Sequence, residues 1–534
     1  MSNQSSFDHI ALIGCGFTGT SAFYQLVDRC PVKNITIFEA SGEFGPGYPY
    51  HPDECQDYLI NNPTSTMCLT PSNRRAFYNW LVLQDEFGPE TDPNGHLPRA
   101  VFGRFLKDVF ASTRTNAAIK GIEVKLVPFE ATGMFEEADG QVSVSWAGGE
   151  VKVDKAILTT GRCPGLDPYP SPPEGSKATY IRDHIQTTEF DKIPLDASIH
   201  VLGASLSAYD VINRIFSPDT GCRFERDSSG ELVFVSGQNN RNLALVSRSG
   251  RMKSFQSRKS SKIPRENFTL EKLTDSAGLG KVTLNQVAEA IQQDMAEQGI
   301  SLDWDKIKNP YHLCRSQDDT NVRAIELLHE AINSAATGTN YLVDYFGGAQ
   351  KEIWDAFACQ LLDLESEQAY REKYETAMLC YVAVCPVPTA EKILALLRAG
   401  RITVIKGVTD VKLNDDGEYY EISHQFGTER AQVLINTTGS VDRGVSSDTQ
   451  PDLIKSLRDS GQLNIYQRGG VAMKGADVDM KNYRLPNTQN IYMANMLLWG
   501  PGFFTSSAHL MASIVENILN GIYGPPHTSK SNRD

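Results

Sequence analysis

A glycine-rich segment near the start of the chain carries the residues whose spacing is best suited to chemistry. Gly14, Gly16 and Gly19 follow directly on a short apolar run, and helically spaced apolar residues begin immediately afterwards. The first glycine permits a tight turn, the second lets backbone N–H groups approach a pyrophosphate, and the third lets a helix pack on the strand. A helix N-terminus there adds partial positive charge. The pattern predicts a dinucleotide site that includes the turn residues Phe17 and Thr18.

An acidic residue completes this first pattern. A second apolar run at residues 35–38 ends at Glu39, where a carboxylate can accept hydrogen bonds from the adenosine ribose hydroxyls. Further glycines follow at once, up to Gly47, and they allow the backbone to approach a flavin closely. This segment favours FAD over NAD at the first turn. A plain surface turn is the alternative interpretation of the same glycines.

A second copy of the pattern begins near residue 198. An apolar run leads into Gly203, with Ser205 and Ala208 at the second and third positions of the motif. Alanine is an accepted variant at the third position, and serine is a mild departure at the second. The next apolar run ends at Ser247 and Arg248 rather than at an acid. A guanidinium pairs well with phosphate oxygens, so this site favours NADPH over NADH. A solvated loop arginine is the alternative.

Two further apolar runs, at residues 155–161 and 433–439, both close on Thr-Thr-Gly. Strands of this kind return the chain to a dinucleotide sheet, which would bring Gly161 and Gly439 near the bound nucleotides. The two runs bracket the second glycine turn. The sequence therefore predicts an NAD(P)-binding domain inserted into a split FAD-binding domain.

Taken together, these motifs resemble those of the FAD-NAD(P)-binding proteins related to class B flavin-dependent monooxygenases, which include bacterial L-aspartate N-monooxygenases. The resemblance covers most of the chain and is weaker over residues 265–375. It is carried by both glycine turns, Glu39 and Ser247-Arg248, and by segments 59–67, 98–106, 436–439 and 499–504.

The resemblance implies places near the flavin for two of these segments. Asn62 and Met67 would lie beside the isoalloxazine ring, and an ordinary core turn is the alternative. Gly500 and Gly502 would lie near the pyrimidine end of the flavin. A helix N-terminus after them would stabilise negative charge on the reduced flavin, and an ordinary helix start capped by Thr505 or Ser506 is the alternative.

The activity implied is that of an FAD-dependent, NADPH-using monooxygenase, which oxidises a small amine or amino acid at nitrogen through a peroxyflavin formed with O2. No catalytic protein nucleophile is predicted, because the chain has no Gly-x-Ser-x-Gly, His-Glu-x-x-His or Cys-x-x-Cys motif. The missing cysteine pair also disfavours a disulfide reductase. Two alternatives stay open: a reductase or oxidase that inserts no oxygen, and a non-catalytic flavin-binding sensor or scaffold.

A carboxylated substrate would need arginine near the flavin. Four arginines in matched segments are candidates by position, although each is more often a surface or ion-paired residue: Arg74, Arg75, Arg104 and Arg484. His509 is a candidate proton donor, and a hydrogen-bonded helix histidine is the alternative.

Composition narrows the functional classes. The formal charge of −14, from 51 basic and 65 acidic residues, argues against a broad nucleic-acid surface. The ten cysteines are dispersed, which favours a reduced, cytoplasmic protein, and no metal site is predicted. The charge-free stretch 491–515 is broken by Gly500-Pro501-Gly502. It therefore predicts a strand, a loop and a helix rather than a membrane span.

We predict an α/β protein with two Rossmann-like dinucleotide-binding domains and a helical insertion. Its expected parts are the first part of the FAD-binding domain at 1–168, the NAD(P)-binding domain at 176–264, the helical insertion at 265–378, the second part of the FAD-binding domain at 379–524 and a flexible tail at 525–534. The expected partners are a small molecule and O2, and homo-oligomerisation is left open.

Overall fold

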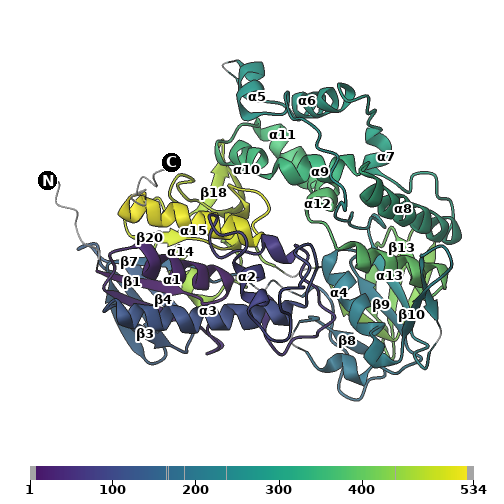
Figure 1. Ribbon diagram of the computed structural model, residues 1–534, viewed down its shortest axis with the longest axis horizontal. Coiled ribbons are helices and arrows are strands. Elements are labelled where there is room, and N and C mark those ends of the chain that lie inside the picture. The colour runs from purple at the N-terminus through teal and green to yellow at the C-terminus, as the bar shows by residue number, and fades with distance from the viewer. Residues whose placement is uncertain are drawn as a thin grey trace.

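The computed structural model describes residues 8–525, apart from Pro164, Leu166, Gln186, Ser236, Leu279, Gly439 and Ser440. These residues form two α/β lobes and a set of helices that covers them (Figure 1). Each lobe is centred on a five-stranded sheet. The predicted class, with two dinucleotide-type sheets and a helical insertion, is therefore confirmed. Of the predicted tail, only Pro525 is among the described residues.

The first lobe is built on a parallel sheet with the strand order β20-β7-β1-β2-β3. Its strands are β1 (His9–Ile13), β2 (Asn34–Phe38), β3 (Glu123–Val127), β7 (Lys155–Leu158) and β20 (Ile491–Met493). All four residues of β7 are buried, and so is β1 apart from His9, as expected when helices cover both faces of a parallel sheet. The helices α1 (Phe17–Arg29), α3 (Arg99–Ile119) and α15 (Ala508–Tyr523) pack together in this lobe.

The second lobe repeats this plan with the strand order β13-β12-β9-β17-β8. Its strands are β8 (Thr179–Ile181), β9 (Ser198–Leu202), β12 (Asn242–Ser247), β13 (Ile402–Lys406) and β17 (Val433–Asn436). The helices α4 (Leu206–Ile215), α8 (Gln317–Thr337) and α13 (Val387–Arg398) pack in this lobe. Its chain also forms the hairpin of β10 (Arg223–Arg226) and β11 (Leu232–Val235).

In both lobes, a three-stranded antiparallel sheet directly precedes one interior strand of the central sheet in the chain. In the first lobe this sheet comprises β4 (Ala131–Glu136), β5 (Val142–Trp146) and β6 (Gly149–Val153), and β7 follows directly. In the second it comprises β14 (Asp410–Leu413), β15 (Tyr420–His424) and β16 (Gly427–Ala431), and β17 follows. The repeated order means that each Thr-Thr run ends a strand beside its own glycine turn.

One predicted boundary is wrong. The second part of the FAD-binding domain was expected to begin at residue 379, but β13 pairs with β12 and β17 pairs with β9. Residues 402–436 therefore complete the second sheet. The first lobe resumes afterwards with α14 (Asp452–Asp459), the hairpin of β18 (Ile465–Arg468) and β19 (Val471–Ala476), and β20. The helical insertion consequently interrupts the second lobe instead of separating the two.

A helical cap lies above both lobes in Figure 1. We use this name for α5 (Leu270–Ala277), α6 (Leu284–Ala296), α7 (Trp304–Lys308), α9 (Tyr341–Gly348), α10 (Gln350–Ala358), α11 (Leu364–Ala369), the π-helical turn Tyr370–Tyr374 and α12 (Glu375–Val382). Side chains of Thr269, Thr283 and Asp363 cap α5, α6 and α11, which satisfies N–H groups that a helix start leaves unpaired. The apolar residues of the cap share one core with the first lobe.

The charge-free stretch 491–515 contains β20, a connecting loop and the start of α15, so the predicted strand, loop and helix are confirmed. Within the described part of the chain, none of the helices combines the length and the apolar character needed to cross a lipid bilayer.

Candidate functional site

The first glycine turn joins β1 to α1 at the carboxyl end of the first sheet. Gly14 has φ +100°, a conformation that side chains disfavour, and a Cβ there would lie 2.6 Å from the Thr159 carbonyl oxygen. The Thr159 hydroxyl donates to the carbonyl oxygens of Ile13 (3.1 Å) and Gly14 (2.6 Å). The end of β7 is therefore fixed against the turn, and only glycine fits at position 14.

Helix α1 begins at Phe17 with Gly16 as its N-cap, and no side chain caps it. The first helical turn contains no acidic residue. Its first N–H groups are therefore free of the side-chain partners that cap other helices, as an anion site requires. Gly16 and Thr18 are half-buried at this end, whereas Phe17 and Gly19 are buried.

Glu39 lies beside this turn at the end of β2. One carboxylate oxygen accepts a hydrogen bond from the Cys15 backbone N–H at 2.8 Å. The other accepts from the backbone N–H and the hydroxyl of Ser41, at 3.1 and 2.8 Å. An ionised carboxylate has about four acceptor positions, and Glu39 is only half-buried. The side chain is thus oriented at the turn and can still accept from a ribose.

The segment after Glu39 returns to the same turn. Gly47 lies against Gly16, with room for no Cβ between them. The next residue, Tyr48, lies under the guanidinium of Arg162, which is 4.5 Å from the ring centroid. Arg162 directly follows Gly161, the glycine of the first Thr-Thr-Gly run. The structure therefore brings the turn, the Gly47 segment and the Gly161 segment together.

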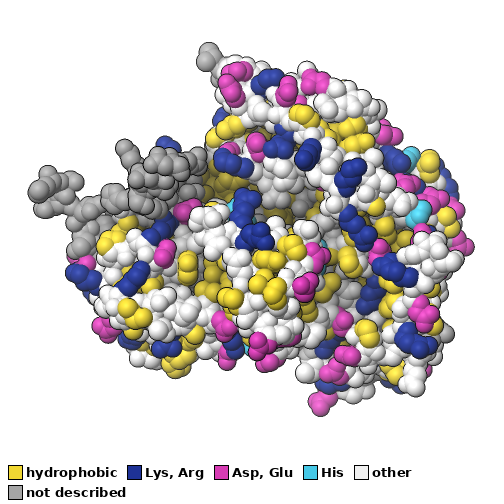
Figure 2. Space-filling model, viewed as in Figure 1, with side chains coloured by type: hydrophobic (Ala, Val, Ile, Leu, Met, Phe, Trp, Pro, Cys, Tyr) yellow, Lys and Arg dark blue, Asp and Glu magenta, His cyan; other side chains and the backbone are white. Residues whose placement is uncertain are grey.

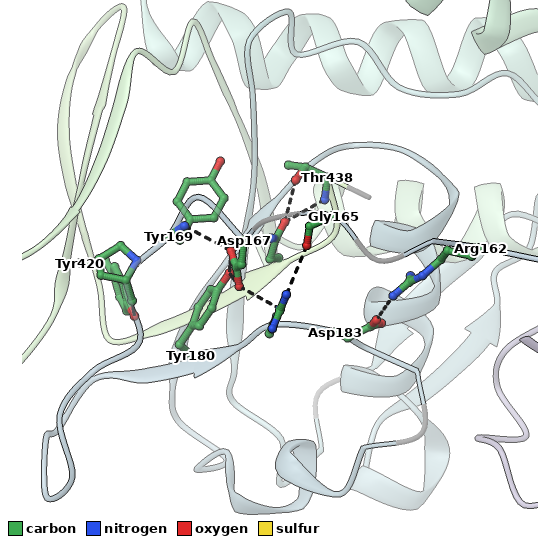
Figure 3. Close-up of polar contacts among 11 residues, drawn as sticks. Arg162, Gly165, Asp167, Tyr169, Tyr180, Asp183, Tyr420 and Thr438 are labelled. Atoms are coloured by element: carbon green, nitrogen blue, oxygen red, sulfur yellow. Dashed lines mark hydrogen bonds and ion pairs between the residues drawn. The ribbon is translucent and has the colours of Figure 1, made fainter. Parts of the chain in front are cut away.

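Arg162 also pairs with Asp183 at 2.5 Å (Figure 3). Burial favours the neutral form of Asp183, but hydrogen bonding by Tyr48 and the charge of Arg162 together hold its pKa below the usual value. Asp183 follows β8 of the second lobe, so this ion pair joins the two lobes beside the first turn.

The second turn repeats the geometry of the first. Gly203 has φ +112°, and a Cβ there would lie 2.7 Å from the Thr437 hydroxyl oxygen. That hydroxyl donates to the Leu202 carbonyl at 2.7 Å, as Thr159 does in the first lobe. Ser205 is the N-cap residue of α4, yet its side chain makes no capping hydrogen bond, and Ala208 is fully buried. The start of α4 therefore also lacks a side-chain cap.

The end of β17 is held by a polar network next to this second turn. The Asn436 side-chain oxygen accepts from the backbone N–H (3.0 Å) and the hydroxyl (2.7 Å) of Thr438, and Asp167 accepts from the Tyr180 hydroxyl at 2.7 Å (Figure 3). Asn436 in turn donates to Asp167 at 3.5 Å. Gly439, predicted near the nucleotide, lies outside the described residues.

Ser247 and Arg248 lie beside the second turn, because the Gly203 N–H donates to the carbonyl of Val246 at 2.8 Å. The Ser247 hydroxyl accepts from the Gly250 N–H at 2.9 Å and closes the loop after β12. Arg248 is exposed. Its guanidinium is therefore accessible at the end of the strand next to the glycine turn, where the sequence predicts a phosphate-binding arginine.

The two segments that the resemblance places near a flavin differ in exposure. Asn62 is exposed and Met67 is buried, and the carbonyl of Asn61 accepts a hydrogen bond from Gln256 of the second lobe. Gly500 and Gly502 are both buried, and Gly502 lies against the indole of Trp354 in the helical cap. Both glycines are thus accounted for by packing between segments as well as by any role near a flavin.

Helix α15 begins at Ala508, and the hydroxyl of Ser507 caps it by accepting from the Leu510 N–H at 3.4 Å. The helix therefore has a side-chain cap, but the cap is Ser507 and not Thr505 or Ser506 as the alternative expected. Just before it, Phe504 has φ +51°, an uncommon conformation for a bulky residue.

Three of the four candidate arginines have structural partners away from both turns. Arg104 pairs with Glu86 at 2.8 Å, Arg75 lies over the Tyr78 ring at 4.6 Å, and Arg484 donates to Gln489 at 2.6 Å.

The fourth candidate, Arg74, contacts the other candidate in this region: it donates to Nε2 of His509 at 3.3 Å. Since arginine can only donate, Nε2 must be unprotonated, and the other ring nitrogen, Nδ1, lies 3.6 Å from the Cys68 sulfur. Burial, reinforced by the Arg74 charge, lowers the pKa of His509. A neutral, positioned imidazole fits these contacts better than the predicted proton donor.

Two arginines that lie against Trp499 were not predicted from the sequence. Arg371 of the π-helical turn and Arg443 lie 4.4 and 4.9 Å from the centroid of its ring. Glu375 pairs with Arg371 at 3.2 Å, and burial raises its pKa although both arginines oppose this. Arg371 belongs to the weakly matching part of the chain, and no motif surrounds Arg443, so neither spacing nor resemblance pointed to them.

Lys and Arg side chains also gather around the hollow between the helical cap and the lobes (Figure 2). In a chain with a formal charge of −14, such a concentration of positive charge attracts anionic ligands such as dinucleotides.

A comparison with known protein families finds a match that covers the first of these sites. A family model described as FAD-NAD(P)-binding matches residues 11–163, which contain the first glycine turn, Glu39, Gly47 and Gly161. Residues 11–163 are therefore similar to the FAD-NAD(P)-binding family.

One curated relative also matches part of the chain. It is an uncharacterized protein of Escherichia coli K12, YdhS, which is 28% identical over 109 residues. The match spans 19% of this chain and 20% of the relative. This relative is similar in sequence, but because it is uncharacterized the match indicates no activity.

Solved structures resemble the chain over nearly its whole length. The FAD-bound cadaverine monooxygenase DfoA of Erwinia amylovora, from desferrioxamine biosynthesis, has a TM-score of 0.55 at 12% identity, covering 97% of this chain and 95% of its own. The L-lysine 6-monooxygenase of Pseudomonas syringae has a TM-score of 0.52 at 14% identity, covering 96% and 98%. Both likenesses show that the fold beyond the FAD-NAD(P)-binding segment, including the second lobe, is shared with these two monooxygenases.

Proposed function

We propose that this protein is an FAD-dependent, NADPH-using monooxygenase that oxidises a small amine or amino acid at nitrogen. The observation that carries the proposal is the pairing of two uncapped glycine turns, one in each lobe, within a fold shared with a cadaverine and a lysine monooxygenase. FAD, when bound, supplies the oxygen chemistry, and NADPH supplies the electrons.

The first lobe would hold FAD. The uncapped start of α1 would bind its pyrophosphate, and Glu39 would accept from the adenosine ribose. Gly47 and Gly161, brought together with the turn through Gly16 and Arg162, would line the path of the flavin. Asn62, Met67, Gly500 and Gly502 would lie around the ring, as the resemblance implies.

The second lobe would hold NADPH. The start of α4, with Gly203 and Ser205, would bind the pyrophosphate, and the exposed guanidinium of Arg248 would pair with the 2′-phosphate. Ser247 would hold the Arg248 loop through its hydrogen bond to Gly250.

The surroundings of Trp499 support an anionic group on the substrate. Arg371 and Arg443 face this ring, and Glu375 and Glu367 approach Arg371 at 3.2 and 3.6 Å. Glu367 is paired with Arg468 as well, so among these groups the arginines outnumber the glutamates and the local charge is positive. Such a site would orient the carboxylate of an amino acid, and the helical cap that supplies Arg371 would help exclude water.

The purified protein tests the proposal directly. We expect a flavin absorption spectrum, NADPH oxidation, and O2 uptake that depends on one member of a panel of amino acids and small amines, with an oxygenated amine as the product. Flavin reduction that yields only peroxide would favour an oxidase or reductase. A bound flavin that NADPH cannot reduce would favour a sensor. Failure to bind FAD on reconstitution would contradict all three.

A further inference from the structure

The helical cap contains an apolar cavity of about 380 Å³ that lies apart from both glycine turns. Its inner wall includes the rings of Phe268, Phe346, Phe357 and Tyr370, all of them buried. The charged residues that line it, Glu289 and Lys308, are exposed and lie at its rim. Open apolar surface of this kind is unfavourable in water and commonly marks a binding site.

The floor of the cavity is joined to the loop that precedes α15. Phe357 contacts Tyr370 with ring centroids 5.3 Å apart, and it stacks on Phe503 at 5.9 Å with 9° between the planes. Phe503 belongs to the segment 499–504 that we place near the flavin. A ligand against Phe357 would therefore be separated from this segment by a single aromatic ring.

The π-helical turn Tyr370–Tyr374 makes a second connection. Tyr370 and Tyr374 line the cavity, whereas Arg371 on the same turn donates to the carbonyl oxygens of Gly500 (2.9 Å) and Gly502 (3.0 Å). Its guanidinium also lies 4.4 Å from the ring centroids of both Phe357 and Trp499. A π-helical turn inside a helix often marks a functional site, and this one contacts the cavity and the 499–504 loop at once.

We propose that the cavity binds one uncharged, apolar small organic molecule, and that the π-helical turn transmits its presence to the 499–504 loop. The size of the cavity favours a small molecule over a peptide helix, because a single helical turn, roughly 10 Å across and 5.4 Å long, would fill it. The absence of charge on the inner wall favours an uncharged ligand. Only the transmission step depends on the proposed function.

The binding step is tested with Nile red, a neutral apolar dye, titrated into the FAD-loaded full-length protein. We expect saturable binding of one dye per chain with increased emission. Ala288→Phe, on the wall of the cavity, fills the space and is expected to weaken binding roughly tenfold, a small change in free energy. Ala296→Phe is the matched control, since Ala296 is exposed on the same helix, and it should bind as the wild type does.

Three results would overturn this step. They are no saturable binding, equal binding by Ala288→Phe and the wild type, or self-association of the chain that Ala288→Phe abolishes, which would make a second copy the occupant. The dye needs no flavin, so the binding step stays readable if FAD is absent.

The transmission step is tested with octanol, which is colourless. Octanol should displace Nile red and shift the visible absorption band of the bound flavin in the wild type but not in Ala288→Phe. An unshifted band on displacement would overturn transmission.

Discussion

At the scale of single residues, FAD binding is expected to depend on the backbone conformation of Gly14. Its φ of +100° and the 2.6 Å between a built Cβ and the Thr159 carbonyl oxygen leave no place for a side chain. Gly14→Ala would therefore displace the end of β7 from the turn, at a cost of about 1–3 kcal/mol. We expect FAD binding to weaken roughly tenfold or more, measured as flavin per chain after dialysis.

Gly88 provides the matched control for this substitution. It also has a positive φ, +68°, but a Cβ there would meet no atom within 4 Å. Gly88→Ala is therefore expected to retain its flavin. Full flavin content in folded Gly14→Ala would contradict the role of the turn.

If the second lobe binds NADPH as proposed, Arg248 makes the protein prefer NADPH to NADH. A hydrogen bond to a charged group contributes about 1.5–3 kcal/mol, so Arg248→Gln should raise KM for NADPH roughly tenfold or more. KM for NADH should change little, because NADH has no 2′-phosphate. Arg223→Gln, at an exposed position on β10, is the control. Equal loss with both cofactors would mean that Arg248 acts on the turn rather than on the phosphate.

Residues at the two turns were predictable from the sequence because their chemistry depends on local spacing. Gly14 and Gly203 each end a strand, and the tight turn to the next helix restricts the residue type there. Arg371 and Arg443 could not be predicted in this way. They meet at Trp499 only because three distant segments pack together, and an isolated arginine in a helix or loop carries no signal of its tertiary neighbours.

At the scale of elements, the sequence predicted the strands better than their pairing. The Thr-Thr runs at the ends of β7 and β17 were both recognised as strands beside a nucleotide. β17 nevertheless pairs with β9, more than 200 residues earlier in the chain. A run of three buried apolar residues, as in β17, fits a central position in either sheet. The helical insertion separates β12 from β13 and β17 in the chain, so the sequence does not indicate that these later strands complete the second sheet.

The central strand β9 carries a titratable group inside this sheet. Burial lowers the pKa of His200 to about 4, and the nearby His424 acts in the same direction. In the unfolded chain a histidine takes up its proton near pH 6.5, about the ordinary value. Between these two values the unfolded state binds more protons than the folded state. The free energy of unfolding therefore falls as the pH falls through this window, and the effect is absent above it.

We expect His200 to destabilise the protein by about 2 kcal/mol between pH 7 and pH 5, since one pH unit corresponds to about 1.4 kcal/mol. His200→Leu removes the titration while keeping an apolar side chain in the sheet. Urea unfolding of both proteins at the two pH values measures the effect. The wild type should lose more stability than the variant on acidification, and parallel losses would show that His200 is protonated in the folded state.

At the scale of the whole molecule, the two lobes are joined by a buried ion pair close to the second turn. Arg99 is the first residue of α3 in the first lobe, and Asp210 lies on α4, the helix that follows Gly203. Their side chains meet at 2.8 Å and are 13% and 7% exposed. His184 also approaches the same carboxylate oxygen, at 3.5 Å. Since α4 would bind the NADPH pyrophosphate, this contact sets the position of one cofactor site relative to the other.

Arg99→Met and Asp210→Leu each leave the remaining charge buried without its main partner, which costs about 3–5 kcal/mol. The double variant removes both charges, so we expect its loss of stability to be clearly smaller than the sum of the single losses. Urea unfolding of the four proteins gives this coupling energy. If the pair also positions α4, the single variants should keep their FAD but be reduced more slowly by NADPH in stopped-flow measurements. Additive losses of stability, with unchanged reduction rates, would show that the lobes keep their arrangement without this ion pair.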